Sequence, residues 1–211
     1  MSDGNTSARA LQDAYTAAAR RIAQQLMSLV AHTPLTPNAL TATGVSLCLA
    51  GSVLVVFESH RHLYYWLGAA VFLLGSVLDI LDGALARAGG KGTEFGAFID
   101  STTDRMGEAA MLGGIGLIFS RHGNTTALAF CFAAIAGSFL VSYARSKAEM
   151  LGLKGAVGIG QRAERVVLIV IGLVFAPWGA LQWAVYALAA MVWFTVLQRI
   201  VSVRSQLRAR G

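Results

Sequence analysis

Four aspartates stand close together near the middle of the chain, at positions Asp79, Asp82, Asp100 and Asp104. The first two are three residues apart and the last two are four residues apart, and both spacings put a pair on one face of a helix. A short segment, 88–93, separates the two predicted helices, so their adjoining ends should bring the carboxylates together. Carboxylate oxygens are ligands that suit Mg²⁺ and Mn²⁺. Two such ions shared by three or four aspartates would form a two-metal clamp for phosphoryl transfer.

The chain around these aspartates is strongly apolar. Of its 211 residues, 55% are hydrophobic and 13% are charged, which is about half the charged fraction of a soluble domain. No charged residue lies within 38–57, 63–78, 123–144 or 166–198. An unpaired Asp at membrane depth costs on the order of 2.5–3.5 kcal/mol. Bound cations would offset that cost for a cluster of carboxylates.

These stretches predict an all-α integral membrane protein, since about 20 apolar residues span the hydrocarbon. Pro177-Trp178-Gly179 divides the last stretch, because Pro ends a helix and Trp favours the membrane interface. We expect one domain over residues 36–211. Its six transmembrane helices should cover roughly 37–57, 63–87, 94–120, 124–150, 160–176 and 179–203.

The first 35 residues are predicted to form a juxtamembrane amphipathic segment rather than a signal peptide. Its apolar residues recur at helical spacing: Leu11, Tyr15, Ala18, Ile22, Leu26 and Val30. Segment 1–35 would therefore lie as a helix on the membrane surface. A leader without defined structure is the alternative.

The basic residues predict the orientation. If the N-terminus is cytoplasmic, the outer loops hold Arg61 and Arg121, and the other fifteen of the seventeen Lys and Arg residues lie on or near the inner side. The positive-inside rule then puts both termini and the aspartates at the cytoplasmic face of the plasma membrane. The net charge of +6 suits anionic lipids or substrates. No nucleic-acid-binding motif accompanies it.

The segment from Asp79 to Asp104 has the spacing D-x2-D-G-x2-A-R-x8-G-x3-D-x3-D, which resembles the CDP-alcohol phosphotransferase family at every fixed position. The resemblance implies metal binding by the aspartates, with Asp104 also the general base that deprotonates the acceptor alcohol. It implies two Mg²⁺ ions, with Mn²⁺ as the other option, and a homodimer. The implied contacts with the CDP moiety are Asp79, Gly83, Ala86 and Arg87, with Asn38 and Thr41 in the segment TPNALT.

Further cations lie far from the aspartates in sequence, within SYARSKAE, GIGQRAER and TVLQRI. Cations at the mouth of an acidic site indicate a second anionic substrate, although inner loops collect basic residues anyway. The same segments resemble the actinobacterial phosphatidylinositol phosphate synthases, which join CDP-diacylglycerol to inositol phosphate and release CMP. By that resemblance the acceptor phosphate would be bound by Lys147, Arg162, Arg165 and Arg199.

Two alternatives remain open at this point. A related enzyme would use glycerol 3-phosphate and make phosphatidylglycerophosphate. A small cation-binding transporter would also place carboxylates in the membrane, but it predicts an internal repeat and charges near the midplane. The chain has no such repeat, and its aspartates gather toward one side.

Overall fold

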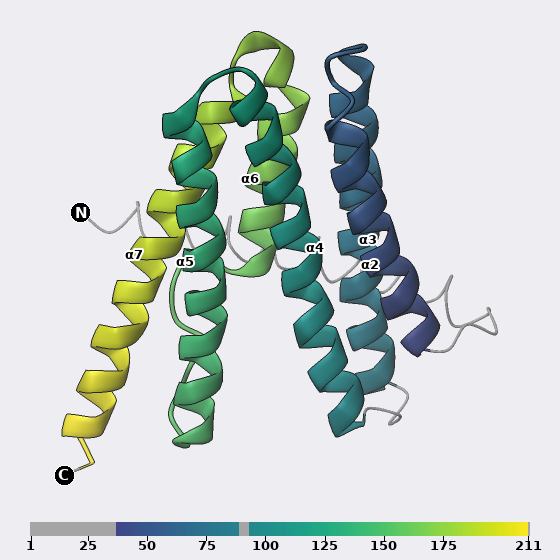
Figure 1. The fold of residues 1–211 in the computed structure, drawn as a ribbon. Helices are drawn as coiled ribbons and strands as arrows, with labels where there is room; N and C mark the ends of the chain where they lie inside the picture. The colour runs from purple at the N-terminus through teal and green to yellow at the C-terminus, as the bar shows by residue number, and fades with distance from the viewer. Residues whose placement is uncertain (1–36, 89–92, 211) are drawn as a thin grey trace, which may run out of the picture.

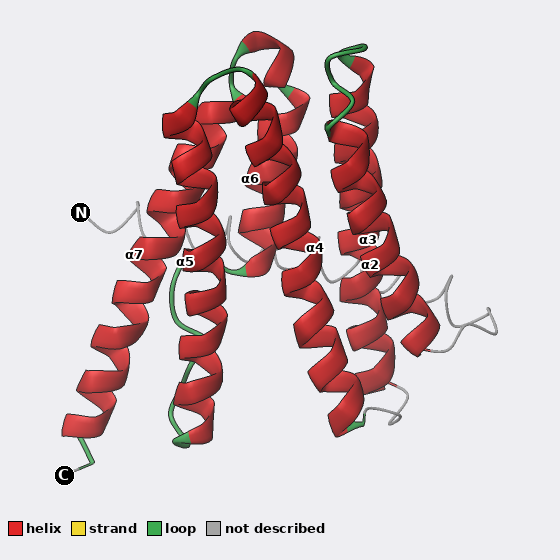
Figure 2. Ribbon diagram, viewed as in Figure 1, coloured by secondary structure: helices red, strands yellow, loops and turns green. Residues whose placement is uncertain are grey.

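The computed structural model describes residues 37–88 and 93–210, with side chains for 39–80 and 93–210. Over these residues the chain is helical and has no strand (Figures 1 and 2). The elements are α2 (Pro37–Val55), α3 (Leu63–Ala88), α4 (Glu94–Arg121), α5 (Thr125–Met150), α6 (Arg162–Val174), the 3₁₀ turn η1 (Ala176–Trp178) and α7 (Leu181–Arg208). Over the described residues the all-α prediction is confirmed, and a helix is found at each of the six segments predicted between 37 and 203. The predicted amphipathic segment 1–35 lies outside the described residues, so it and the domain boundary stay predictions.

Local sequence explains where these helices begin and end. The Thr93 hydroxyl accepts from the backbone N–H of Gly96 at 2.9 Å and caps α4, and Asn124 caps α5 in the same way at 3.0 Å. Such caps satisfy N–H groups that have no partner within the helix. Gly179 has φ of 79°, a left-handed conformation that favours glycine and lets the chain turn from η1 into α7. The cap at Thr93 fixes the start of α4, which carries two of the aspartates.

The helices form two groups, α2 with α3 and α4, and α5 with α7, which diverge toward one end. Helix α2 packs against α3 and α4, while α5 packs against α7 and α4, and α6 contacts α3 and α7. In Figure 1, α4 and α5 lie close at the loop that joins them and separate toward their other ends. The diverging ends are the start of α4 and the end of α5, where the aspartates and many basic residues lie.

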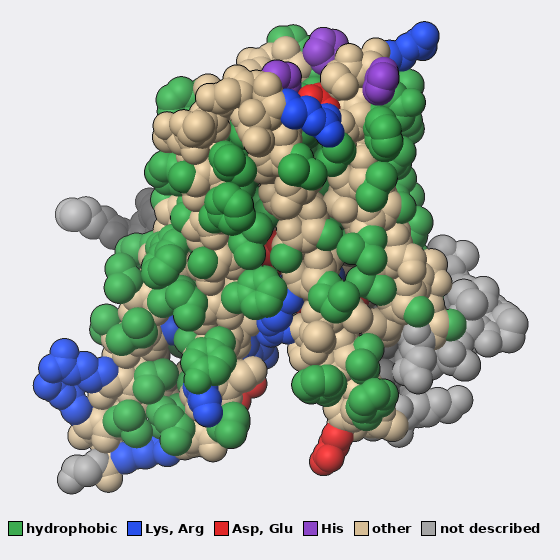
Figure 3. All heavy atoms as spheres, in the orientation of Figure 1, with side chains coloured by type: hydrophobic (Ala, Val, Ile, Leu, Met, Phe, Trp, Pro, Cys, Tyr) green, Lys and Arg blue, Asp and Glu red, His purple; other side chains and the backbone are tan. Residues whose placement is uncertain are grey.

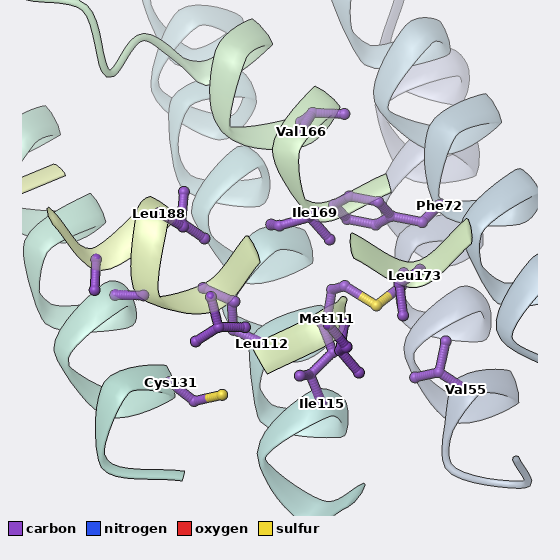
Figure 4. Packing of buried hydrophobic residues seen from close by; sticks show 14 of the residues in the cluster. Val55, Phe72, Met111, Leu112, Ile115, Cys131, Val166, Ile169, Leu173 and Leu188 are labelled. Carbon is purple, nitrogen blue, oxygen red and sulfur yellow. The ribbon is translucent and has the colours of Figure 1, made fainter. Parts of the chain in front are cut away.

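The apolar core occupies the middle of the bundle. Figure 4 shows Phe72 of α3, Met111 and Ile115 of α4 and Leu173 of α6 packed together. All four side chains are at most 1% exposed. This core joins the two groups of helices away from their diverging ends.

Close contact between α2 and α3 depends on small residues. A Cβ at Gly75 would lie 2.6 Å from the carbonyl oxygen of Gly44, a distance that side chains do not adopt. A Cβ at Gly44 would lie 3.3 Å from Cβ of Asp79. Glycine at both positions therefore brings α2 directly against the part of α3 that carries Asp79.

The outer surface carries many large apolar side chains, as Figure 3 shows on one face. Three helical stretches in the described residues are long and apolar enough to cross a membrane: Leu63–Ile80, Thr125–Met150 and Leu181–Arg208. Helix α2 adds a shorter apolar stretch, Ala39–Val55. These features are those of a membrane protein. The crossing of the membrane by all six helices remains a prediction.

Candidate active site

Three of the four predicted aspartates converge in the structure. Asp79 comes from α3, and Asp100 and Asp104 come from α4, one helical turn apart. One ligand atom from each lies within 4.8 Å of the others. Asp79 is buried, and the other two are half-buried. Asp82 follows Asp79 by one turn of α3, but its side chain is outside the described set, so its place in the cluster stays a prediction.

The cluster fits a divalent cation by its chemistry. Its donors are carboxylate oxygens, the ligands of hard cations. Oδ1 of Asp104 is buried and accepts no hydrogen bond from the described residues. A buried oxygen without a well-directed hydrogen bond is costly, and coordination of a metal would offset that cost. The three aspartates therefore form a candidate metal-binding site.

Arg162, the first residue of α6, reaches into this cluster. Its Nη1 donates to Oδ2 of Asp79 and lies 2.5 Å from Oδ1 of Asp104, an ion pair without the geometry of a hydrogen bond. Arg162 was predicted to bind the acceptor phosphate, and the structure places it on two predicted metal ligands. One guanidinium brings a single positive charge to three carboxyl groups. The negative charge of the cluster is therefore only partly neutralised by Arg162, and a divalent cation could neutralise the rest.

Glu108, one turn after Asp104 on α4, binds the next arginine of α6, Arg165. Nε and Nη2 of Arg165 each donate to a carboxylate oxygen of Glu108 at 2.8 Å. Nη1 of Arg165 donates to the carbonyl oxygen of Gly160 at 2.8 Å, and the Ser138 hydroxyl donates to Glu108 at 2.7 Å. The side chains of the ion pair are both 5% exposed. This network ties α4, α5 and the start of α6 together one turn beyond Asp104.

The sequence pointed only partly to this network. Glu108 extends the stripe of Asp100 and Asp104 by one turn, which predicts a supporting role or an ion pair, either with Arg105 or with another helix. The structure shows the pair with another helix, through Arg165. Arg165 was predicted to bind the acceptor phosphate, whereas its described contacts are with protein groups. Nothing in the sequence marked Ser138 or Gly160, because a single hydroxyl or carbonyl carries no pattern.

The last two predicted phosphate ligands lie elsewhere. Lys147 of α5 and Arg199 of α7 line a groove of about 570 Å³ between those helices. Arg199 is buried, and its guanidinium donates to the carbonyl oxygens of Val157, at 2.8 Å, and Val141. Lys147 is exposed and lies 5.9 Å from the centre of the Tyr143 ring. The four predicted acceptor ligands therefore occupy three environments, and their described contacts do not join them into one pocket.

The predicted nucleotide contacts are described only in part. Thr41 is buried on α2, three residues before Gly44, which abuts Asp79. The side chains of Asn38, Gly83, Ala86 and Arg87 lie outside the described residues, so their contacts with CDP remain predictions. The structure therefore places one of the two α2 candidates on the stretch of helix that adjoins the carboxylate cluster.

Comparisons with known proteins agree with this geometry. The model of the family "CDP-alcohol phosphatidyltransferase" matches residues 34–198. The archaetidylinositol phosphate synthase of Pyrococcus horikoshii is 37% identical over 188 residues, which cover 89% of this chain and 91% of that protein. The phosphatidylinositol phosphate synthase of Mycobacteroides abscessus is 31% identical over 190 residues, covering 88% of this chain and 84% of the relative.

Solved structures resemble the whole bundle. The crystal structure of Mycobacterium tuberculosis phosphatidylinositol phosphate synthase with CDP-DAG bound matches with a TM-score of 0.74 and 29% identity, over 87% of this chain and 94% of that one. A structure of the same enzyme in complex with manganese and citrate matches with a TM-score of 0.75 and 28% identity, over 86% and 88% of the two chains.

Proposed function

This chain belongs to the CDP-alcohol phosphatidyltransferase family, and from that premise we propose its reaction. It transfers a phosphatidyl group from CDP-diacylglycerol to a hydroxyl of inositol phosphate and yields phosphatidylinositol phosphate and CMP. The observation that carries the proposal is the cluster of Asp79, Asp100 and Asp104 inside the region that the family model matches. Because the chain belongs to a transferase family, we no longer retain the alternative of a small cation-binding transporter.

The acceptor has broader support than the lipid of the donor. The two relatives described above are named for different lipids, archaetidyl and phosphatidyl, and both names contain inositol phosphate. Inositol phosphate is therefore the proposed acceptor. Diacylglycerol is the proposed lipid because the solved relative of similar fold holds CDP-DAG. The glycerol 3-phosphate alternative has no such support among these relatives.

The aspartates would hold the metal. Asp79, Asp82, Asp100 and Asp104 are the proposed ligands of two Mg²⁺ ions, with Mn²⁺ as the other option. When bound, such ions hold diphosphate oxygens and stabilise the negative charge that develops on the leaving CMP. Manganese in a solved relative supports a divalent ion of this kind.

Asp104 is the proposed general base. Its Oδ1 is buried, and its described partner is the Arg162 guanidinium, 2.5 Å away in an ion pair without hydrogen-bond geometry. If Arg162 turns to the acceptor phosphate, as proposed below, a lone pair of Oδ1 becomes available for the proton of the acceptor hydroxyl. The acceptor oxygen then forms a bond to the lipid-side phosphorus, and the bond from that phosphorus to CMP breaks. The proton leaves on Asp104, and CMP carries away the electron pair.

The arginines of α6 are proposed to bind the acceptor phosphate together with Lys147 and Arg199. Arg162 has the strongest support, because its guanidinium already lies beside Asp104. Arg165 uses three of its nitrogens on Glu108 and Gly160, and an Arg has five N–H donors. One N–H on each Nη therefore remains for a phosphate, held in a fixed direction by the ion pair.

We also propose the placement of the enzyme in the membrane. Six spans would cross the plasma membrane, with both termini and the aspartates on the cytoplasmic side, and two copies would form a homodimer. Figure 3 shows basic side chains mainly around the diverging ends of the bundle, with fewer beside the histidines at the opposite end. That asymmetry supports the orientation through the positive-inside rule.

The proposal is tested by release of CMP from purified protein with CDP-diacylglycerol and Mg²⁺. Inositol phosphate, free inositol and glycerol 3-phosphate are supplied separately, each with and without a chelator, and a CDP-archaeol donor forms a further arm. Turnover with inositol phosphate alone, lost with chelator, is the expected result. Turnover with glycerol 3-phosphate or free inositol instead would overturn the acceptor assignment and keep the reaction class. No CMP with any acceptor would overturn the donor.

A further inference from the structure

The groove between α5 and α7 has a lining of two kinds only. Its apolar residues are Ala144, Ala148, Leu151, Ile200, Val203 and Leu207. Its remaining residues are the cations Lys147, Arg199, Arg204 and Arg208. It has neither an acidic residue nor a neutral polar one. A groove with these two properties matches an amphiphile that carries negative charge.

Three of the four cations that line the groove are not neutralised by a carboxylate of the described residues. Lys147, Arg204 and Arg208 form no ion pair with the carboxylates of the described residues. All three are exposed. Figure 3 shows basic side chains gathered around the lower ends of α5 and α7. A phosphate at this rim would receive charge-assisted hydrogen bonds that the protein itself does not supply.

The apolar floor distinguishes between anionic occupants. Lys147 and Arg199 are the residues proposed above for the acceptor phosphate, which leaves Arg204 and Arg208 for a second anion. An inositol ring carries hydroxyl groups that need hydrogen-bond partners, and the Ile200, Val203 and Leu207 side chains that accompany these two arginines offer none. Within the lining, Leu151, Ile200 and Leu207 are between 47% and 57% exposed and would pack well against an acyl chain. A second copy of this chain would bring its own cations against these four, so like charges oppose that occupant.

We propose that the groove between α5 and α7 binds an anionic phospholipid, with its phosphate on Arg204 and Arg208 and an acyl chain along Ile200, Val203 and Leu207. The site is separate from the carboxylate cluster, and its lipid is not the reacting donor. It sits where α7 ends, and a bound lipid would hold the ends of α5 and α7 together. Arg210 makes a similar connection within the protein, since its Nη1 donates to the Leu151 carbonyl oxygen at 3.0 Å.

The test measures lipid binding to the full-length protein in detergent by native mass spectrometry, without CDP-lipid or acceptor. Dioleoylphosphatidylglycerol is compared with dioleoylphosphatidylcholine. We expect preference for the anionic lipid, and roughly 25-fold weaker binding of it by the double variant Arg204→Gln/Arg208→Gln, from about fivefold for each basic residue near an anionic headgroup. Lys154→Gln is the matched control, because Lys154 is exposed near the same end of α5 but lies outside the groove.

A second variant tests the apolar half. Val203→Trp leaves the four cations in place and fills the apolar floor of the groove. It should weaken binding of the anionic lipid while folding is retained, as thermal unfolding reports.

Equal binding of the two lipids, or unchanged binding by both variants, would overturn the proposal. So would displacement of the lipid by inositol phosphate, which would show that Arg204 and Arg208 belong to the acceptor site with Lys147 and Arg199. A change of oligomeric state in Val203→Trp without a change in lipid binding would show an interface between copies. None of these outcomes depends on turnover, so they are separable from a failure of the proposed reaction.

Discussion

Replacement of Glu108 by Gln should strongly destabilise the bundle. The carboxylate accepts hydrogen bonds from Nε and Nη2 of Arg165 and from Ser138, and both members of the ion pair are 5% exposed. Glutamine keeps the shape of the side chain but has no negative charge. Its amide NH₂ would also point a hydrogen-bond donor at the N–H groups of Arg165 or the hydroxyl of Ser138. Removing one partner of a buried ion pair leaves the other uncompensated and costs about 3–5 kcal/mol.

The assay is thermal unfolding of the detergent-solubilised protein, followed by intrinsic tryptophan fluorescence. For a chain of this length 1 kcal/mol corresponds to roughly 2–4 °C in Tm, so Glu108→Gln should lower the Tm by about 6–20 °C. The matched control is Glu149→Gln, which removes an ion pair with Arg145 whose side chains are 52% and 49% exposed. Exposed pairs of this kind contribute roughly 0.3–0.5 kcal/mol, so the control should move the Tm by about 2 °C or less.

A double variant separates the lost ion pair from general damage. Glu108→Leu/Arg165→Leu removes both charges, and replacement of a buried pair by apolar groups is often close to neutral. Its Tm should therefore exceed that of Glu108→Gln, although activity falls because Arg165 is lost. A Tm for Glu108→Gln within about 2 °C of the parent protein, where exposed pairs fall, would refute the reasoning. A double variant less stable than Glu108→Gln would show that the two residues do not act as a pair.

The remaining predictions concern the carboxylate cluster and the helix contacts. Asp104→Asn should lower the rate of CMP release by roughly 10²–10⁴-fold, the range for loss of a general base, with a Tm close to that of the parent; activity within tenfold would contradict its role. Arg162→Gln should raise the KM for inositol phosphate by roughly tenfold or more, as for a lost charged hydrogen bond; a lower kcat at unchanged KM would show that Arg162 acts through Asp79 and Asp104 instead of binding the acceptor. Gly75→Ala should destabilise by about 1–3 kcal/mol, since its Cβ would lie 2.6 Å from the Gly44 carbonyl oxygen. Gly113→Ala is its control in thermal unfolding, because a Cβ there meets nothing within 4 Å.

Much of the fold follows from the sequence for local reasons. Uncharged stretches near membrane-spanning length predicted the helices, and polar caps at Thr93 and Asn124 explain where α4 and α5 begin. The spacing of Asp100 and Asp104 placed them on one face of a helix, because side chains four residues apart are neighbours there. The short connection from α3 to α4 then predicted that Asp79 would join them. These inferences use contacts between residues close in the chain.

The tertiary structure alone decided how the distant cations are used. Arg162 pairs with Asp79 across 83 residues and Arg165 with Glu108 across 57, and neither partner could be read from periodicity. Helical spacing determines which residues share a face, but it does not say which helix that face will meet. That choice depends on shape, as where Gly44 and Gly75 let α2 approach α3. The sequence therefore determined the helices and the chemistry of the carboxylates, while packing of α6 and α7 determined which arginines reach the carboxylates and which line the separate groove.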